Sequence, residues 1–211
     1  MSERRCYDQF CGVARALDVL GERWTLLLVR DLLLSPRRYG ELLAINDGLT
    51  TNLLARRLKD LTAAGVISCR GGLYALTAAG MDLEPVVMEL GRWGRQWADG
   101  PRQPEERRDI GWAMLSMQRR FLPGWKGVVE VRVGSDPTRT FTWTFGRDRL
   151  MVRERAADLP DVAVAGAVED VLAWLFGGAS SASLRAGGRL RVEGEPSAWE
   201  GLLGAVAGLV G

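Results

Sequence analysis

The chain has 211 residues, of which 47% are hydrophobic and 26% charged, so it is long enough for one large or two small domains with packed cores. Its formal net charge is only +2, and it contains no histidine, which removes the commonest general base and most zinc sites. The three cysteines lack CxxC spacing, and no glycine-rich segment has the context of a phosphate-binding loop. We therefore expect no catalytic residues, no metal site, no cofactor and no enzymatic activity.

No apolar run approaches the roughly 20 residues that a membrane span needs. The first residues, Met-Ser-Glu-Arg-Arg-Cys, lack the apolar core of a signal peptide. These features predict a cytoplasmic protein without a membrane partner, in which Cys6, Cys11 and Cys69 are reduced by default.

Residues 35–43 and 49–61 predict two short amphipathic helices joined by a turn. Such a pair packs through its apolar faces and can present its second helix to the major groove of DNA. Three leucines of the second segment share one stripe at helical spacing: Leu54, Leu58 and Leu61. Residues 35–70 hold six basic against three acidic residues, a modest excess that is typical of binding at specific sites rather than general coating of nucleic acid.

The opposite side of the second helix is polar and basic. Thr50 is suited to the N-cap position, where its hydroxyl can accept a bond from an otherwise unpaired backbone N–H. Asn52, Arg56 and Lys59 follow on the outer face with Ala63, and such side chains can bond both base edges and phosphates. The alternative is that this face is only solvated, as on most amphipathic helices.

Residues 66–77 predict a β-hairpin directly after this helix. Gly65 is placed to end the helix, and Gly71-Gly72 is typical of a tight turn between two strands. The order of helix, helix, hairpin and long helix is that of a winged helix.

Several segments in this order resemble the HxlR family of bacterial winged-helix regulators, which are relatives of the MarR group. They are residues 11–24 (CGVARALDVLGERW), the helix pair and hairpin above, and residues 76–80 (LTAAG). The resemblance covers roughly residues 6–98 and implies a homodimer that binds a two-fold-related operator in double-stranded DNA. It implies that the helices around 11–20 and 81–98 form the dimer interface.

The resemblance also implies which residues face DNA. They lie before the second helix, along it and in the wing: Arg37, Arg38, Thr50, Thr51, Asn52, Arg56, Lys59 and Arg70. The wing is cut down to Arg70-Gly-Gly, which is shorter than family wings, so we expect it to make fewer minor-groove contacts.

Cys11 lies where some members of this family carry a cysteine that senses oxidants or electrophiles. Such a thiol needs access and a lowered pKa, and Arg15, four residues on, is a candidate source of positive charge. Cys6 is a candidate resolving partner, although free cysteines are more often inert. We expect Cys69 to pack in the wing strand and Trp24 to anchor the core.

Two prolines and a charge cluster predict a linker over residues 101–108, between a first domain at 1–100 and a second at 109–211. Periodicity in the second domain predicts strands and helices that form an α+β fold with helices on one face of a sheet. The expected strands are 127–133, 140–145, 149–153, 161–165 and 189–194, and the expected helices are 110–121, 168–176 and 197–209.

Residues 107–211 are similar to the sterol-carrier-protein-like fold. The similarity is carried by segment 160–166, helix 168–176, and segment 188–195 followed by the last helix. It implies an apolar tunnel, between the sheet and the helices, that accepts lipids or other hydrophobic molecules.

Aromatic side chains supply the candidate ligand-binding residues of this domain. Phe141, Trp143 and Phe145 share one strand face, which Trp112, Trp125, Trp174 and Phe176 can approach from the helices. The alternative is that these residues pack the core.

The whole sequence thus predicts a homodimeric DNA-binding regulator whose second domain binds a hydrophobic effector. Thiol-based sensing through Cys11, and a hydrophobic-ligand carrier without a DNA role, are the alternatives.

Overall fold

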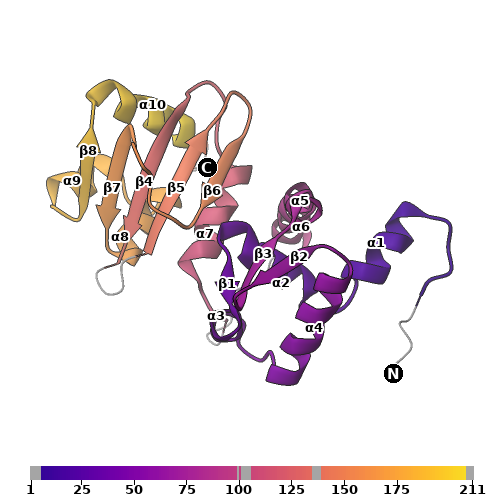
Figure 1. Cartoon of the computed structure of the whole chain (residues 1–211). Helices are drawn as coiled ribbons and strands as arrows, with labels where there is room; N and C mark the ends of the chain where they lie inside the picture. Colours follow the sequence, from indigo (N-terminus) through magenta and orange to yellow (C-terminus); the bar gives the residue numbers. More distant parts are fainter. Residues whose placement is uncertain (1–5, 99, 101–105, 135–138, 208–211) are drawn as a thin grey trace. The chain divides into compact units, whose positions relative to one another are not determined.

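The computed structural model describes residues 6–98, 100, 106–134 and 139–207. The chain divides into two compact units, Met1–Arg107 (the N-terminal unit) and Arg108–Gly211 (the C-terminal unit) (Figure 1). This division falls within the predicted linker, residues 101–108, of which 101–105 lie outside the described residues.

The N-terminal unit combines helices with a small antiparallel sheet whose strand order is β1-β3-β2. The elements in chain order are α1 (Gly12–Leu20), α2 (Thr25–Leu34), β1 (Arg37–Arg38), α3 (Tyr39–Ile45), α4 (Thr51–Ala63), β2 (Ile67–Arg70), β3 (Leu73–Leu76), α5 (Ala78–Met81) and α6 (Glu84–Trp97). The predicted helix pair is α3 and α4, and the predicted wing is the β2–β3 hairpin. Strand β1, which pairs with β3, was not expected from the sequence.

The core of this unit follows from the leucine stripe of α4. Leu54, Leu58 and Leu61 are buried, and they belong to one apolar cluster with Leu28 and Val29 of α2. Gly71 and Gly72 of the wing turn have φ values of 57° and 76°. Left-handed values at both central positions are what a two-residue hairpin turn requires, and glycine adopts them without strain.

The C-terminal unit is built on a five-stranded sheet with the order β6-β5-β4-β7-β8, in which only the β4–β7 pair is parallel. Its elements are α7 (Ile110–Ser116), the 3-10 helix η1 (Met117–Arg119), β4 (Gly127–Val133), β5 (Arg139–Phe145), β6 (Leu150–Arg153), β7 (Val162–Gly166), α8 (Val168–Leu175), α9 (Ser181–Ala186), β8 (Leu190–Gly194) and α10 (Pro196–Val206).

The observed elements of this unit follow the expected α+β order, with two differences. The predicted helix 110–121 ends at Ser116 and continues as η1, and α9 was not expected. The last helix is described to Val206, and positions 208–209 of the predicted span lie outside the described residues.

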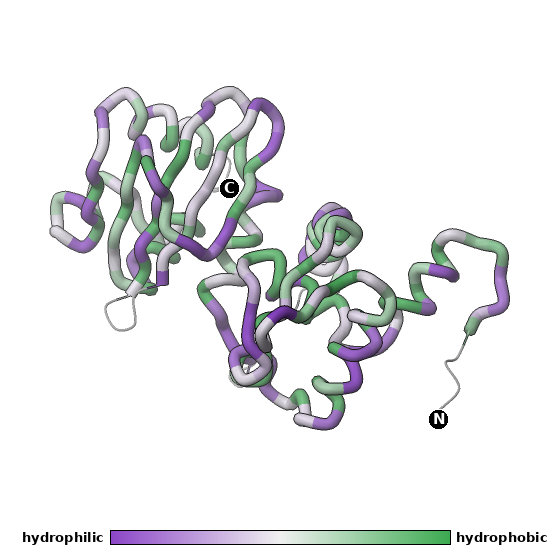
Figure 2. The backbone as a smooth tube through the Cα atoms, viewed as in Figure 1, coloured by the Kyte–Doolittle hydropathy of each residue, from purple (hydrophilic) through white to green (hydrophobic). Residues whose placement is uncertain are grey.

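The two faces of the sheet are covered differently. On the helix face, Trp143 of β5 stacks on Trp174 of α8, with ring centres 6.5 Å apart. On the other face, the chain around residues 155–157 accepts a hydrogen bond from Thr142 Oγ1 (2.8 Å) and donates one to Glu130 Oε2 (2.9 Å). Figure 2 shows hydrophobic residues along the strands of this sheet, as expected for a buried layer.

Candidate nucleic-acid interface

The start of helix α4 is held by two polar contacts. Thr50 is the N-cap, and its side-chain oxygen accepts a bond from the backbone N–H of Leu53 (3.4 Å). The hydroxyl of Tyr39, the first residue of α3, donates to the carbonyl oxygen of Thr51 (2.6 Å). The two helices of the pair are therefore joined by a hydrogen bond as well as by their leucines.

A buried polar cluster fixes the turn between α3 and α4. Asn46 is 3% exposed, and its Nδ2 donates to Asp31 Oδ2 (2.7 Å) and to the carbonyl oxygen of Leu42 (3.0 Å). Asp31 is also buried, and its carboxylate lies 2.9 Å from the guanidinium of Arg30. A buried carboxylate is tolerated when it is paired and hydrogen-bonded in this way, and the cluster makes the geometry of the turn specific.

The outer face of α4 carries the side chains that the sequence predicts there. Asn52, Arg56 and Lys59 are exposed, as are Thr50 and Thr51 at the start of the helix. The side chain of Arg56 is 57% exposed and lies 3.9 Å from Asp60, a distance at which a solvated ion pair holds the side chain only weakly. This polar face is therefore available to a partner.

Arg57, the next residue, has a different role. Its side chain is 7% exposed and pairs with Glu22 and with Asp60, and its Nε donates to the carbonyl oxygen of Arg23 (3.2 Å). It therefore joins α4 to the segment that follows α1.

The two arginines before α3 belong to the wing sheet. Arg37 is half-buried and lies opposite Tyr74 in the β1–β3 ladder. Arg38 is exposed, and its Nη1 lies 3.5 Å from the carbonyl oxygen of Gly71 in the wing turn. Arg70 is exposed at the end of β2, next to the same turn. The structure thus brings Arg38 to the wing turn, a contact that the sequence did not indicate.

Cys69 differs from its prediction. It is exposed on β2 rather than packed, although alternation places it on the same strand face as the buried Ile67 and opposite Tyr74. Partial burial, and then the neighbouring Cys69 thiol, raise the pKa of Tyr74.

Cys11 is exposed at the N-cap of α1. The backbone N–H groups of Ala14 and then Val13, in the first turn of the helix, lower the pKa of its thiol. The suggested role of Arg15 is not seen, because its guanidinium lies over the ring of Phe10 at 4.7 Å and it does not contribute to this pKa shift.

The pKa of the Cys6 thiol is shifted in the opposite direction. The backbone N–H of Asp8 acts to lower the pKa of its thiol, but the carboxylate of Asp18, 3.3 Å from the sulfur, is among the groups that outweigh it. The net pKa of Cys6 is therefore raised, which leaves Cys11 as the more readily ionised thiol of the two.

The candidate ligand-binding aromatics are brought together only in part. Phe141, Trp143 and Phe145 are buried on the helix face of β5, and Trp174 meets them from α8. Trp125 also contacts Phe145 (5.1 Å between ring centres), but it comes from the loop before β4 and not from a helix.

The other two candidates lie differently. Trp112 is half-buried on α7, and Phe176 is partly exposed beside Arg120 at 5.1 Å. Trp199 of α10, which the sequence did not single out, lies 5.7 Å from Trp174 and extends the cluster. Close contacts among these rings indicate a packed core, and binding of a hydrophobic ligand at this cluster stays a prediction.

Among the described residues, no group of three or more Cys, Asp or Glu side chains is arranged to hold a metal ion. No helix in the described part of the chain combines the length and the apolar character needed to cross a membrane.

Comparison with known proteins covers the N-terminal unit. Residues 19–101 match the family model described as HxlR-like helix-turn-helix. The uncharacterized HTH-type transcriptional regulator Rv3095 of Mycobacterium tuberculosis is 36% identical over 100 residues, which are 44% of this chain and 63% of the relative. The chain thus spans less than two thirds of that relative's length.

Two Bacillus subtilis proteins are similar over the same region. The uncharacterized HTH-type transcriptional regulator YvaP is 33% identical over 93 residues, covering 40% of this chain and 85% of YvaP. The crystal structure of quinone-bound YodB is 29% identical and matches 40% of this chain and 97% of that chain, with a TM-score of 0.39.

Proposed function

Because this chain belongs to the HxlR-like helix-turn-helix family, we propose that it is a homodimeric DNA-binding transcriptional regulator that inserts α4 into the major groove. The observation that carries the proposal is the outer face of α4. It presents Asn52, Arg56 and Lys59 to solvent, on a helix whose start and preceding turn are fixed by Tyr39 and Asn46.

Each side chain of this face has a chemical role in the proposal. Arg56 can donate two hydrogen bonds to the major-groove edge of guanine, and Asn52 can bond the edge of adenine. Thr50, Thr51 and Lys59 suit contacts to phosphate, which position the helix without reading sequence. Arg38 and Arg70, beside the wing turn, are placed for further phosphate contacts.

The homodimer is supported by two exposed apolar stripes. On α1 and the segment before it, Phe10, Val13 and Leu17 follow helical spacing and are 95%, 68% and 42% exposed. On α6 a second stripe is formed by Val86, Leu90, Trp93 and Trp97. Apolar side chains that line up on a helix and face solvent are typical of surfaces that a partner covers. These are the two helices expected at the dimer interface.

A two-fold dimer gives the regulator its geometry. Its two α4 helices must lie about 34 Å apart to enter successive major grooves on one side of DNA. A molecule that favours one dimer arrangement by about 1–3 kcal/mol is enough to shift DNA affinity. In the proposal the C-terminal unit has this sensing role, for a hydrophobic effector. Both repression and activation fit, and the site of action is the cytoplasm.

The test is binding of the purified chain to the DNA upstream of its own gene. We expect a specific complex whose affinity falls by about 1–3 kcal/mol in Arg56→Ala. Arg147→Ala, which removes an exposed arginine of the C-terminal unit, is the matched control and is expected to bind normally. Unchanged affinity in Arg56→Ala would exclude base reading by Arg56. Weak, sequence-indifferent and salt-sensitive binding by the parent chain would instead favour a carrier without a DNA role.

A second candidate, thiol-based sensing, is favoured by Cys11 alone among the three cysteines. It is exposed, its pKa is lowered by the first turn of α1, and it lies beside the Phe10 stripe that the proposal assigns to the dimer interface. Its ionised thiolate would be the group that adds to an electrophile, and the added group would then disturb the interface. Treatment with N-ethylmaleimide is expected to release DNA from the parent chain and from Cys69→Ser, but not from Cys11→Ser. Equal release from all three proteins would remove this candidate.

A further inference from the structure

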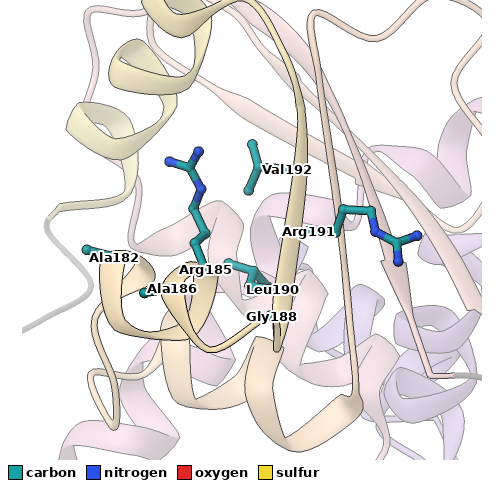
Figure 3. A pocket seen from close by; sticks show the side chains of 7 residues that line it. All are labelled: Ala182, Arg185, Ala186, Gly188, Leu190, Arg191 and Val192. Carbon is teal, nitrogen blue, oxygen red and sulfur yellow. The ribbon is translucent and has the colours of Figure 1, made fainter.

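A groove in the C-terminal unit lies between α9 and the edge strand β8 (Figure 3). Its volume is about 680 Å³, within the range typical of small-molecule sites. Residues from α9, the following turn and β8 line it: Ala182, Arg185, Ala186, Gly188, Leu190, Arg191 and Val192.

The lining is apolar except for its arginines, and it includes no carboxylate. The guanidinium of Arg185 lies over the ring of Trp199 at 5.4 Å, which orients it without neutralising it. No acidic side chain in the described part of the chain pairs with Arg185, whereas nearby Arg189 is paired with Asp170. An oriented and uncompensated positive charge therefore lies beside an apolar surface.

The outer edge of β8 adds a backbone donor to this groove. Gly134 N donates to the carbonyl oxygen of Gly166, so the backbone groups of Gly166 point toward β4. Alternation then turns Ala165 toward β8, where it lies opposite Arg191. The next residue of β8, Val192, directs its N–H and C=O away from the sheet, and no partner for them is found among the described residues.

We propose that this groove binds a small amphipathic anion. The apolar body lies against Ala186, Leu190 and Val192, and the carboxylate or similar anionic group meets the guanidinium of Arg185. The inference rests on the proposed function only in assigning the ligand a regulatory role, since the binding chemistry itself depends on the groove alone.

The structure supplies a matched control within the same groove. Side chains alternate along a strand, so Arg191 points to the opposite side of β8 from Leu190 and Val192. Figure 3 shows the guanidinium groups of Arg185 and Arg191 on opposite sides of the strand. Arg191 thus lines the groove without directing its charge into it, and only Arg185 is expected to determine binding of the anion.

The experiment is calorimetric titration of the full chain with octanoate, 1-octanol and acetate. We expect octanoate to bind, and both the neutral alcohol and the short anion to bind at least about tenfold more weakly, since each lacks one half of the required chemistry. Arg185→Gln is expected to weaken octanoate binding about tenfold, and by clearly more than Arg191→Gln does. Ala186→Phe, which fills the groove, is expected to abolish binding, with Ala156→Phe on an exposed loop as its control.

Several results would overturn the proposal. Absence of octanoate binding, equal binding by Arg185→Gln, or acetate binding as strong as octanoate binding would each do so. If Arg185→Gln changed the oligomeric mass but not octanoate binding, the groove would be identified as a contact between copies of the chain. Circular dichroism and urea unfolding of each variant show whether its fold is intact.

A parallel titration with operator DNA separates this inference from the proposed function. If the chain binds octanoate through Arg185 but does not bind DNA specifically, the anion site is supported and the proposed DNA-binding function is refuted. If the chain binds DNA specifically but does not bind octanoate, the DNA-binding function is supported and the anion site is refuted.

Discussion

In the C-terminal unit Trp143 and Trp174 lie inside the protein, whereas in the N-terminal unit Trp93 and Trp97 lie on its surface. Trp143 is fully buried, but Trp93 and Trp97 are 55% and 69% exposed. Burying such a ring is among the largest apolar gains available to a chain. The C-terminal unit obtains that gain from its own sheet and helices, and in the proposed dimer the N-terminal unit obtains it from a second copy. Under the proposed function, one unit is therefore complete as a monomer, and the other is complete only as a dimer.

The largest expected change in stability comes from removing a ring from the core of the C-terminal unit. Trp143→Ala removes a fully buried ring that stacks on Trp174, so it should lower the free energy of unfolding of the C-terminal unit by about 3–5 kcal/mol. Urea unfolding followed by tryptophan fluorescence measures this loss. Leu159→Ala, at an 88% exposed position of the same unit, is the control and should change stability by less than about 0.5 kcal/mol. Equal effects of the two changes would contradict the packed core.

Placing a charge on the exposed apolar stripe of α6 tests whether the N-terminal unit dimerises through this helix. Trp93→Glu should weaken dimerisation by about 2–4 kcal/mol, because a tryptophan at the centre of an interface commonly dominates its energy. Sedimentation velocity over a dilution series measures the dimer dissociation constant. Gln96→Glu adds the same charge to an exposed position of α6 off the stripe, and it should leave the dimer intact. If Trp93→Glu dimerised like the parent chain, the stripe would have another purpose.

A smaller change separates the internal stability of the helix pair from that of the dimer. Tyr39→Phe removes one hydrogen bond, from the hydroxyl to Thr51 O, and should lower the free energy of unfolding of the N-terminal unit by about 1 kcal/mol. Thermal unfolding at a fixed dimer concentration is the measurement, with Tyr7→Phe on the exposed N-terminal segment as the control. A loss of the same size in both variants would argue against the bond.

The smallest expected effect is a difference in rate between two thiols of the incomplete unit. The pKa of Cys11 is lowered and that of Cys6 is raised, so at neutral pH a larger fraction of Cys11 is thiolate. Iodoacetamide should therefore label Cys11 a few-fold faster, as measured by peptide mass spectrometry after timed reaction. The ratio should fall toward one as rising pH ionises both thiols, and also in denaturant. Faster labelling of Cys6 at neutral pH would reverse the assignment.

The sequence predicted helices and strands with strong local patterns better than it predicted elements that depend on contacts with distant parts of the chain. The stripe of Leu54, Leu58 and Leu61 and the Gly71-Gly72 turn are local signals, and the structure contains the helix and hairpin that they predict. Strand β1 was missed because two adjacent arginines have no alternating pattern, and it forms only where β3 offers an edge. Helix α9 was missed because its serines and alanines bury one large residue, Leu184.

Two neighbouring residues of the candidate interface show that sequence alone does not determine whether a side chain is exposed or buried. Arg56 and Arg57 are chemically identical in the sequence, yet one faces solvent and the other is enclosed by Glu22 and Asp60. The same limit applies to the tryptophans. Periodicity places Trp93 and Trp143 on apolar faces but does not tell whether such a face meets its own core or another molecule.

The contacts of Arg57 also have a mechanical consequence. Glu22 and Arg23, which hold Arg57, come directly after the last turn of α1, so α1 and α4 are connected by a short link of side-chain contacts. A rotation of α1, caused by a rearranged dimer or by a group attached at its first residues, would tilt α4 through this link. If the proposed dimer forms, this link would act as a lever within the N-terminal unit, which converts an event at the dimer interface into a change in the fit of α4 to the DNA groove.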